Sequence, residues 1–291
     1  MKNKVYLNNE EIINLEKKYK RLKERLESLN SAVIGFSGGV DSTFLLKVSA
    51  DVLGNNVLAL TARSSTYPER EYREAVQYAK DLGVKHESFY SDELEIPGFS
   101  DNPIDRCYHC KKELFLKINE VAKKKGYQAV LDGANYDDVG DYRPGMEAAK
   151  ELGVVSPLKE VEMTKLEIRF LSERMGLPTW DKPAFACLAS RFPYGSKITK
   201  EKLQLVEKAE IFMRDLGFKQ VRVRHHGSLA RIEVAPEERE KLFDIQLWDE
   251  IGNAFKVFGF TYATVDVLGY RTGSMNDTIS IEGQKNTRGS E

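Results

Sequence analysis

A glycine-rich turn between a strand and a helix constrains the fold of this chain more than any other feature. The apolar run SAVIGF at residues 31–36 is typical of a buried strand, the turn SGGVDS follows it, and TFLLKVSADVLG indicates a helix that ends at Gly54. The alternation continues with predicted strands at 56–62, 84–90 and 127–134 and with helices that open at Pro68 and near residue 108. The sequence therefore predicts an α/β fold with a mostly parallel sheet and helices on both faces.

The pattern changes after the irregular stretch LPTWDKPAFACLASRFPYGS. The predicted elements beyond it are a helix at 199–217, strands at 219–227 and 229–234, a helical stretch from Pro236 to about Phe258, and a strand at 262–267. They indicate a small α+β domain. We expect a first domain over residues 1–195 with an N-terminal helix at 9–29, a small domain for substrate binding or oligomerisation over 196–270, and a flexible tail over 271–291.

Composition excludes several classes of protein. The 44 Lys and Arg residues against 45 Asp and Glu residues give a net charge of -1, so nucleic acid is not an expected partner. No apolar run reaches the roughly 18 residues of a membrane span, and the first residues are charged where a signal peptide would be apolar. We therefore expect a cytoplasmic protein that does not bind membranes. Three cysteines are too few for a disulfide framework.

The turn SGGVDST has the chemistry of a phosphate cradle. Gly38 and Gly39 allow the backbone to approach an anion closely, Ser37 and Ser42 add hydroxyl groups, and the start of the helix adds N–H groups and a favourable dipole. The loop lacks the lysine of the GxxxxGK[ST] motif, which disfavours a kinase or an ordinary NTPase. The pattern SGGxDS resembles the PP-loop of the N-type ATP pyrophosphatases. That resemblance implies an adenine nucleotide alpha hydrolase-like fold, ATP as substrate, pyrophosphate release, and a catalytic Asp41.

Other polar residues follow the ends of predicted strands at the same sheet edge. Arg63 and Ser64 end the second strand, where the adenosine of ATP should lie, and Gly133 follows a later strand. The segment beyond it offers Asp137 and Asp138, together with Arg143. The two carboxylates could hold the Mg²⁺ that accompanies ATP, or they could belong to a solvated acidic loop.

The cysteines have an unusual distribution. Cys107 and Cys110 form a CxxC pair at the start of a predicted helix, and Cys187 lies far along the chain. The residues alone leave open a thioredoxin-like redox pair, a structural zinc site, unconnected thiols, or three thiolates on one iron–sulfur cluster. A helix would point His109 away from the two thiols.

The chain closely resembles the LarE-type sulfur transferases of nickel-pincer nucleotide synthesis over about residues 10–270. The motifs that carry the resemblance are SGGVDST, TARSSTYPERE, RCYHCK, DGANYDDVGDYRPG, SPL and KPAFACLASRFPYG, in this order. The resemblance implies adenylylation by ATP of a carboxylate of pyridinium-3,5-biscarboxylic acid mononucleotide, and then its conversion to a thiocarboxylate. Members with one cysteine sacrifice its sulfur. Members with three resemble enzymes in which a [4Fe-4S] cluster carries the sulfide.

This sequence has all three positions, so the resemblance implies that Cys107, Cys110 and Cys187 hold a [4Fe-4S] cluster and are catalytic. It also implies a nucleotide substrate, a supply of sulfide or another sulfur donor, and a homo-oligomer. Sacrificial transfer of the Cys187 sulfur is the alternative within the family.

Substrate contacts are expected in the small domain. Arg222 and Arg224 are two residues apart on a predicted strand, which places both guanidinium groups on one face as a phosphate clamp, unless that face is merely an exposed polar one. The resemblance supports these two positions, and also Ser190 and Arg191. Glu233 could pair with the arginines or bind a metal. Glu210 is a weaker candidate for a site residue, and we expect His225 and His226 at the surface. We expect His86 to be structural.

Three other functions compete with this hypothesis. A PP-loop tRNA thiolase with a similar cluster should carry a basic groove or an RNA-binding module, and the near-neutral charge disfavours it. A synthetase that uses ammonia would leave the cysteines without a role. A non-catalytic ATP sensor or iron–sulfur carrier would bind ATP without releasing pyrophosphate.

Overall fold

The computed structural model describes residues 6–139, 144–183 and 186–271. These residues divide into two compact units, one formed by residues up to Glu93 together with Asp105–Phe185, and the other by Leu94–Ile104 together with the chain from Ala186 onward. The second unit thus begins before residue 196, where the sequence suggested a boundary, and it includes a short segment from the middle of the first unit. Most of the predicted tail, residues 272–291, lies outside the described residues.

The first unit is built on a parallel sheet with strand order β3-β2-β1-β4. Its strands are β1 (Ala32–Gly35), β2 (Val57–Arg63), β3 (Lys85–Tyr90) and β4 (Ala129–Leu131). Its helices are α1 (Asn9–Glu27), α2 (Val40–Leu53), α3 (Glu69–Asp81), α4 (Arg106–Lys125), α5 (Pro144–Glu151), α6 (Pro157–Glu160) and α7 (Lys165–Arg174). Short 3-10 turns lie at η1 (Gly54–Asn56) and η4 (Tyr136–Asp138), and η2 (Glu93–Glu95) begins at the last residue before the chain enters the second unit. The predicted parallel α/β fold is confirmed. Helices α5 to α7 were not predicted, because the segment before them is rich in Asp and Gly.

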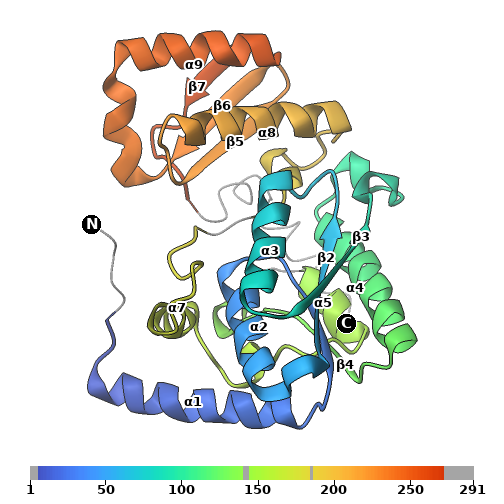
Figure 1. Cartoon of the computed structure of the whole chain (residues 1–291). Helices are drawn as coiled ribbons and strands as arrows, with labels where there is room; N and C mark the ends of the chain where they lie inside the picture. Colours follow the sequence, from blue (N-terminus) through green and yellow to red (C-terminus); the bar gives the residue numbers. More distant parts are fainter. Residues whose placement is uncertain (1–5, 140–143, 184–185, 272–291) are drawn as a thin grey trace. The chain divides into compact units, whose positions relative to one another are not determined.

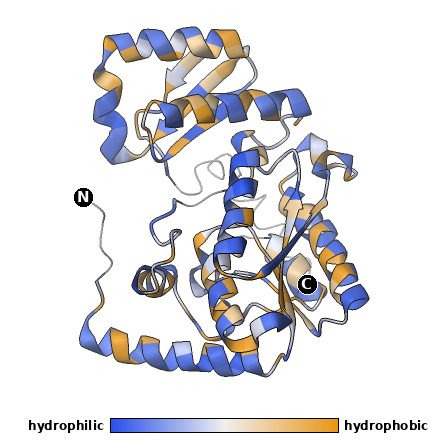
Figure 2. Ribbon diagram, viewed as in Figure 1, coloured by the Kyte–Doolittle hydropathy of each residue, from blue (hydrophilic) through white to orange (hydrophobic). Residues whose placement is uncertain are grey.

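Both faces of this sheet are covered, as Figure 1 shows for α2 and α3 on one side and α4 on the other. Alternate residues of β1 explain the arrangement, since Ile34 packs in the core with α1, α2, α3 and α7, while Val33 packs in the core with α4 and α5. Figure 2 shows these helices striped with apolar and polar residues, as expected for helices that cover a sheet. Among the described residues, no helix is both long and apolar enough to cross a membrane.

The second unit has a small mixed sheet, in which β5 (Val221–His226) pairs antiparallel with β6 (Leu229–Val234), and β6 pairs parallel with β7 (Tyr262–Val265). The helical elements of this unit are η3 (Phe99–Asp101), η5 (Leu188–Arg191), α8 (Lys200–Asp215), η6 (Pro236–Phe243) and α9 (Ile245–Phe258). The predicted α+β order is therefore confirmed. The predicted helical stretch after Pro236 is two elements, because the Asp244 side chain caps α9 by accepting from the backbone N–H of Gln246.

Two expectations about histidines have different outcomes. His225 was expected at the surface, which is wrong: it is buried, and its ring packs between those of Phe192 and Phe260. Polar and apolar residues alternate along this strand, and such a pattern suggests that the polar residues are exposed. The burial of His225 could therefore not be predicted from the local sequence. The ring of His86 lies 2.9 Å from Thr61 Oγ1, inside the sheet of the first unit, in keeping with a structural role.

Candidate active site

The glycine-rich loop connects β1 to α2 at the carboxyl edge of the parallel sheet. Gly39 is the N-cap of α2, and the Ser37 and Ser42 hydroxyls lie 3.1 Å apart across the turn. Gly38 has φ +60, and a Cβ added there would lie 2.9 Å from Cβ of Ala75 on α3. Only glycine fits this position, both for its left-handed backbone and for the close approach of α3. The loop is therefore held against a helix that is distant in sequence.

Gly133 lies beside the start of α2, after the end of β4. A Cβ at Gly133 would come within 3.1 Å of the backbone nitrogen of Ser42. The absence of a side chain thus lets the loop after β4 approach the phosphate cradle closely. This brings the segment that holds Asp137 and Asp138 to the same sheet edge, as the parallel topology predicts.

Asp41 forms an ion pair with Lys165, the first residue of α7. Burial raises the pKa of the Asp41 carboxyl, and the Lys165 charge opposes that rise. The second carboxylate oxygen of Asp41, Oδ1, is buried and has no hydrogen-bond partner in the part of the chain that the structure describes. A buried, unsatisfied carboxylate oxygen is a fitting ligand for a divalent cation. Sequence reasoning missed Lys165, because nothing in its local sequence marks it among many surface lysines.

Asp137 and Asp138 have local structural contacts. Asp137 accepts a hydrogen bond from the backbone N–H of Lys165 at 2.8 Å, and Asp138 closes a capping box by accepting from the N–H of Asn135 at 3.0 Å. They are thus neither a fully solvated acidic loop nor a ready-made cation cage. The negative charge of Asp138 contributes to the raised pKa of Asp41, so the two carboxylates share one electrostatic environment. Arg143 lies outside the described residues.

Arg63 and Ser64 end β2 at the same edge. The Arg63 guanidinium is exposed, pairs with Glu69 at 2.9 Å and lies over the ring of Tyr72. The Ser64 hydroxyl lies 3.2 Å from that of Thr66. Both side chains are therefore held by neighbours at the place predicted for the adenosine.

Cys107 and Cys110 lie near the start of α4, and residues three apart share one face of a helix. Both side chains are thiols and neither is fully buried. His109 instead lies 3.1 Å from Asp105 through its Nε2, away from the thiol face as predicted. Cysteine sulfurs are the donors that iron–sulfur clusters require. The donor chemistry of this turn therefore fits the predicted cluster.

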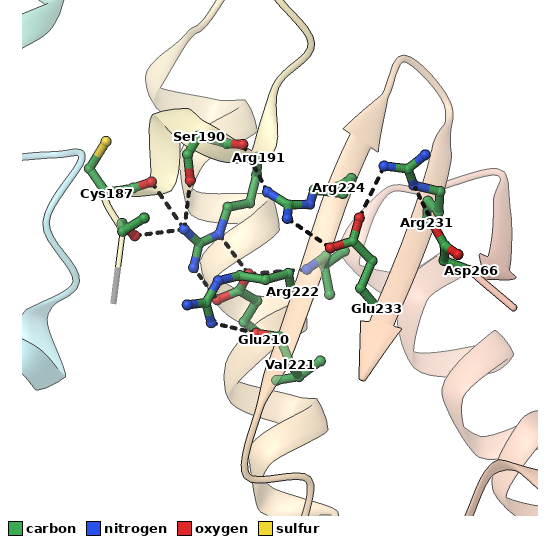
Figure 3. Close-up of polar contacts among 12 residues, drawn as sticks. Cys187, Ser190, Arg191, Glu210, Val221, Arg222, Arg224, Arg231, Glu233 and Asp266 are labelled. Carbon is green, nitrogen blue, oxygen red and sulfur yellow. Dashed lines mark hydrogen bonds and ion pairs between the residues drawn. The ribbon is translucent and has the colours of Figure 1, made fainter. Parts of the chain in front are cut away.

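Cys187 belongs to the second unit, where it is the N-cap of η5. Figure 3 shows its sulfur pointing away from Arg191, while its backbone carbonyl points toward that side chain. The Arg191 guanidinium donates to the carbonyls of Ala186 at 2.6 Å and Cys187 at 3.1 Å. Arg191 thus helps to hold the Cys187 backbone, whose carbonyl also accepts from the Ser190 N–H at 3.0 Å. Among the described residues, no group of three or more His, Cys, Asp or Glu side chains is arranged to hold a metal ion.

Arg191 is itself completely buried in an ion pair with Glu210 of α8. Glu210 also accepts from the backbone N–H of Val223 and from Arg214. Burial opposes ionisation, but the adjacent Arg191 charge prevails and lowers the pKa of Glu210 to about 2. Glu210, a weak candidate from the sequence, is therefore the central carboxylate of this unit.

Arg222 and Arg224 share one face of β5, as predicted (Figure 3). Both side chains are buried. Arg224 pairs with Glu233 on β6 at 2.7 Å and donates to the carbonyl of Ser190 at 3.0 Å. Arg222 lies over the Tyr270 ring, and burial together with the Arg191 charge lowers its pKa to about 10. The alternative of an exposed polar strand face is therefore wrong.

Among the residues that the structure describes, arginines outnumber carboxylates in this cluster. Its ion pairs join four arginines to three carboxylates, and Arg222 adds a fifth guanidinium, giving five positive charges to three negative ones; the residues are Arg191, Arg214, Arg222, Arg224 and Arg231 with Glu210, Glu233 and Asp266. Guanidinium groups gathered in one place are suited to an anionic ligand, because each can donate charge-assisted hydrogen bonds.

Together these features define a PP-loop nucleotide-binding unit followed by a small α+β unit with an arginine cluster, the architecture of an ATP-utilising enzyme. The family model for NAD synthase matches residues 14–106, which include the loop. The chain is 46% identical over 266 residues to the Synechocystis sp. protein slr1717, covering 91% of this chain and 99% of that protein.

It is also 39% identical over 256 residues to the pyridinium-3,5-bisthiocarboxylic acid mononucleotide synthase of Lactiplantibacillus plantarum, covering 88% of this chain and 92% of that protein. A GMP synthase from Aeropyrum pernix is 26% identical over 205 residues, which cover 63% of this chain and 39% of that protein. The chain belongs to the LarE family of ATP-utilising sulfurtransferases, the family of the Lactiplantibacillus enzyme. The predicted resemblance is confirmed.

Proposed function

We propose that this protein adenylylates a carboxylate of pyridinium-3,5-biscarboxylic acid mononucleotide with ATP and converts it to a thiocarboxylate. The observation that carries the proposal is a PP-loop with a buried, partly unsatisfied Asp41 in a chain that is 39% identical to a synthase of the bisthiocarboxylic acid mononucleotide. The three cysteines supply the thiol chemistry that sulfur transfer needs.

Two bond exchanges describe the reaction. A substrate carboxylate oxygen attacks the α-phosphorus of ATP, and the bond from that phosphorus to the bridging oxygen of pyrophosphate breaks. A sulfur nucleophile then attacks the acyl carbon, and AMP leaves with the electrons of the acyl C–O bond. The first step develops negative charge on pyrophosphate, and the loop amides at the start of α2 are suited to bind that charge.

Asp41 and Lys165 would act on the triphosphate. The unsatisfied Oδ1 of Asp41 fits the Mg²⁺ that ATP brings, and Lys165 supplies a cation where the loop itself has none. Asp137 and Asp138 would tune this site by their charge rather than enclose the metal, because both accept hydrogen bonds from the backbone.

The thiols of Cys107, Cys110 and Cys187 are the proposed ligands of a [4Fe-4S] cluster. When bound, such a cluster would supply the sulfur nucleophile of the second step. The chain's own contribution is to present two thiols on one helical turn and to hold the Cys187 backbone through Arg191. The proposal also includes a supply of sulfide or another sulfur donor, and a homo-oligomeric state.

The arginine cluster would bind the phosphate of the mononucleotide substrate. Its gathered guanidinium groups and the single-faced placement of Arg222 and Arg224 suit a phosphate, which accepts several charge-assisted hydrogen bonds. Ser190 and Arg191 would support this site from η5, with Glu233 holding Arg224 in place.

The test is to measure iron and acid-labile sulfide per chain on protein reconstituted without oxygen, next to Cys107→Ala, Cys110→Ala and Cys187→Ala variants. Pyrophosphate release is measured in parallel with and without the mononucleotide. About four irons, lost in each variant, together with substrate-dependent pyrophosphate release, are expected. Activity that needs Cys187 alone in iron-free protein would instead establish sacrificial transfer. ATP binding with no pyrophosphate release would make the protein a sensor or carrier.

A further inference from the structure

Two side chains donate hydrogen bonds to backbone carbonyl groups of the phosphate loop. The Tyr67 hydroxyl donates to the carbonyl of Ser37 at 2.8 Å, and the Lys182 Nζ donates to the carbonyl of Gly38 at 3.2 Å. Tyr67 immediately precedes Pro68, the N-cap of α3, and Lys182 lies after α7, so neither belongs to the loop or its neighbouring strand. Two consecutive peptide groups of the cradle thus have partners that come from elsewhere in the fold.

The direction of a carbonyl determines the direction of the amide that follows it. In a planar trans peptide the C=O of one residue and the N–H of the next point to opposite sides. Holding the Ser37 carbonyl therefore orients the Gly38 N–H, and holding the Gly38 carbonyl orients the Gly39 N–H. Neither of these two amides donates a hydrogen bond within the part of the chain that the structure describes. Both are therefore oriented but unsatisfied, as donors for an anion should be.

Lys182 is fixed firmly enough to act in this way. Its Nζ pairs with Glu71 at 2.7 Å and with Glu74 at 2.8 Å, and it lies over the Tyr78 ring, so three residues of α3 enclose it. Burial would lower the pKa of Lys182, but the charge of Glu71 prevails and raises it, so the ammonium stays protonated.

The backbone around Lys182 is also held. Arg169 donates to the carbonyl of Trp180 at 2.5 Å and to the carbonyl of Lys182 at 2.8 Å. Gly38 lies against Ala75 on the same face of α3 that carries Glu71 and Glu74. Both the loop and Lys182 thus pack against helix α3.

We propose that Tyr67 and Lys182 are positioning residues that aim the Gly38 and Gly39 amides at the pyrophosphate portion of ATP. This inference rests on one part of the proposed function, which is that the loop binds ATP. Sulfur transfer is not needed for it. Neither side chain has to contact the nucleotide, since each acts through a carbonyl of the loop.

Tyr67→Phe is the decisive variant because it removes one hydroxyl and changes no charge. Calorimetric titration should show pyrophosphate and ATP binding about fivefold weaker, which is the effect of one neutral hydrogen bond. The affinity for adenosine, which has no phosphate, should stay the same. Tyr72→Phe is the matched control, since it removes a hydroxyl from α3 that lies 3.0 Å from Ser88 rather than from the loop.

Lys182→Met extends the test to the second amide, with an expected loss of about twentyfold for pyrophosphate because this hydrogen bond is charge-assisted. Lys47→Met, which removes a lysine paired with Asp51 on α2, is its control. Tyr67→Phe remains informative if Lys182→Met fails to fold.

Three outcomes are distinguishable. A selective loss of pyrophosphate affinity in Tyr67→Phe supports the inference. Unchanged pyrophosphate affinity, or an equal loss for adenosine, refutes it while leaving the proposed function intact. Failure of the unmodified protein to bind either ATP or pyrophosphate refutes both.

Discussion

Arg191 and Glu210 form a fully buried, two-point ion pair, with Nε 2.8 Å from Oε1 and Nη2 3.0 Å from Oε2. The same guanidinium holds the carbonyls of Ala186 and Cys187, and the same carboxylate holds the N–H of Val223. The pair therefore joins three segments: the one that carries the predicted sulfur-handling cysteine, helix α8, and strand β5, which carries the arginine pair.

Replacing Glu210 by glutamine should strongly destabilise the protein. The change leaves the buried Arg191 charge without its counterion, which costs about 3 to 5 kcal/mol of unfolding free energy. Chemical denaturation checks the value. Glu201→Gln removes an exposed carboxylate from the same helix and should leave the midpoint nearly unchanged. A Glu210→Gln variant as stable as the unmodified protein would mean that the pair contributes little net stability.

The contribution of Glu210 to stability should change with pH only in the acidic range. Folding lowers the pKa of this carboxyl from its ordinary value of 4.5 to about 2, because the Arg191 charge outweighs burial. The ionised form therefore stabilises the folded state fully above pH 4.5, and this contribution is lost as the pH falls toward 2. The difference in unfolding free energy between the unmodified protein and Glu210→Gln should shrink over this range. A difference that stays constant would contradict the assignment.

Gly38→Ala should abolish nucleotide binding. A side chain at φ +60 is disfavoured by about 1 to 2 kcal/mol, and here its Cβ would also lie 2.9 Å from Ala75. Gly83→Ala is a matched control, because Gly83 has φ +68 but nothing within 4 Å of an added Cβ. Thermal melts and ATP titration of both variants separate the conformational cost from the steric one. Equal effects in both would mean that contact with α3 is unimportant.

Asp41→Asn should slow pyrophosphate release by about a hundredfold, because an amide is a poor ligand for Mg²⁺ and cannot pair with Lys165. The rate is measured at saturating ATP. Asp51→Asn changes an exposed carboxylate of the same helix that pairs with Lys47, and it should leave the rate unchanged. Normal release by Asp41→Asn would exclude a role for this carboxylate in catalysis.

Arg222→Gln should raise KM for the mononucleotide about tenfold with little change in kcat, because it removes a guanidinium from the proposed phosphate site. The loss should be largest at low salt. Lys208→Gln, which removes an exposed charge from α8, is the control. An unchanged KM would assign Arg222 a purely structural role.

Local sequence patterns were sufficient for the framework of this protein. The parallel sheet, the helix after SGGVDS and the helical CxxC turn follow from apolar periodicity, glycine positions and capping residues, which act over a few neighbouring residues. The three-residue spacing of the cysteines on a helix also predicted that His109 points away from the two thiols.

Contacts between distant segments decided the rest. Lys165 reaches Asp41 and Lys182 reaches Gly38 only because α7 and the segment after it pack against α2 and α3, and nothing near either lysine in sequence marks it. His225 is buried because Phe192 and Phe260 close over it. The amino-acid sequence was enough to predict a phosphate loop, a thiol pair and an arginine pair. The partners of Asp41, Arg191 and Arg224 became visible only in the folded protein, since ion pairing and burial depend on distance in space rather than along the chain.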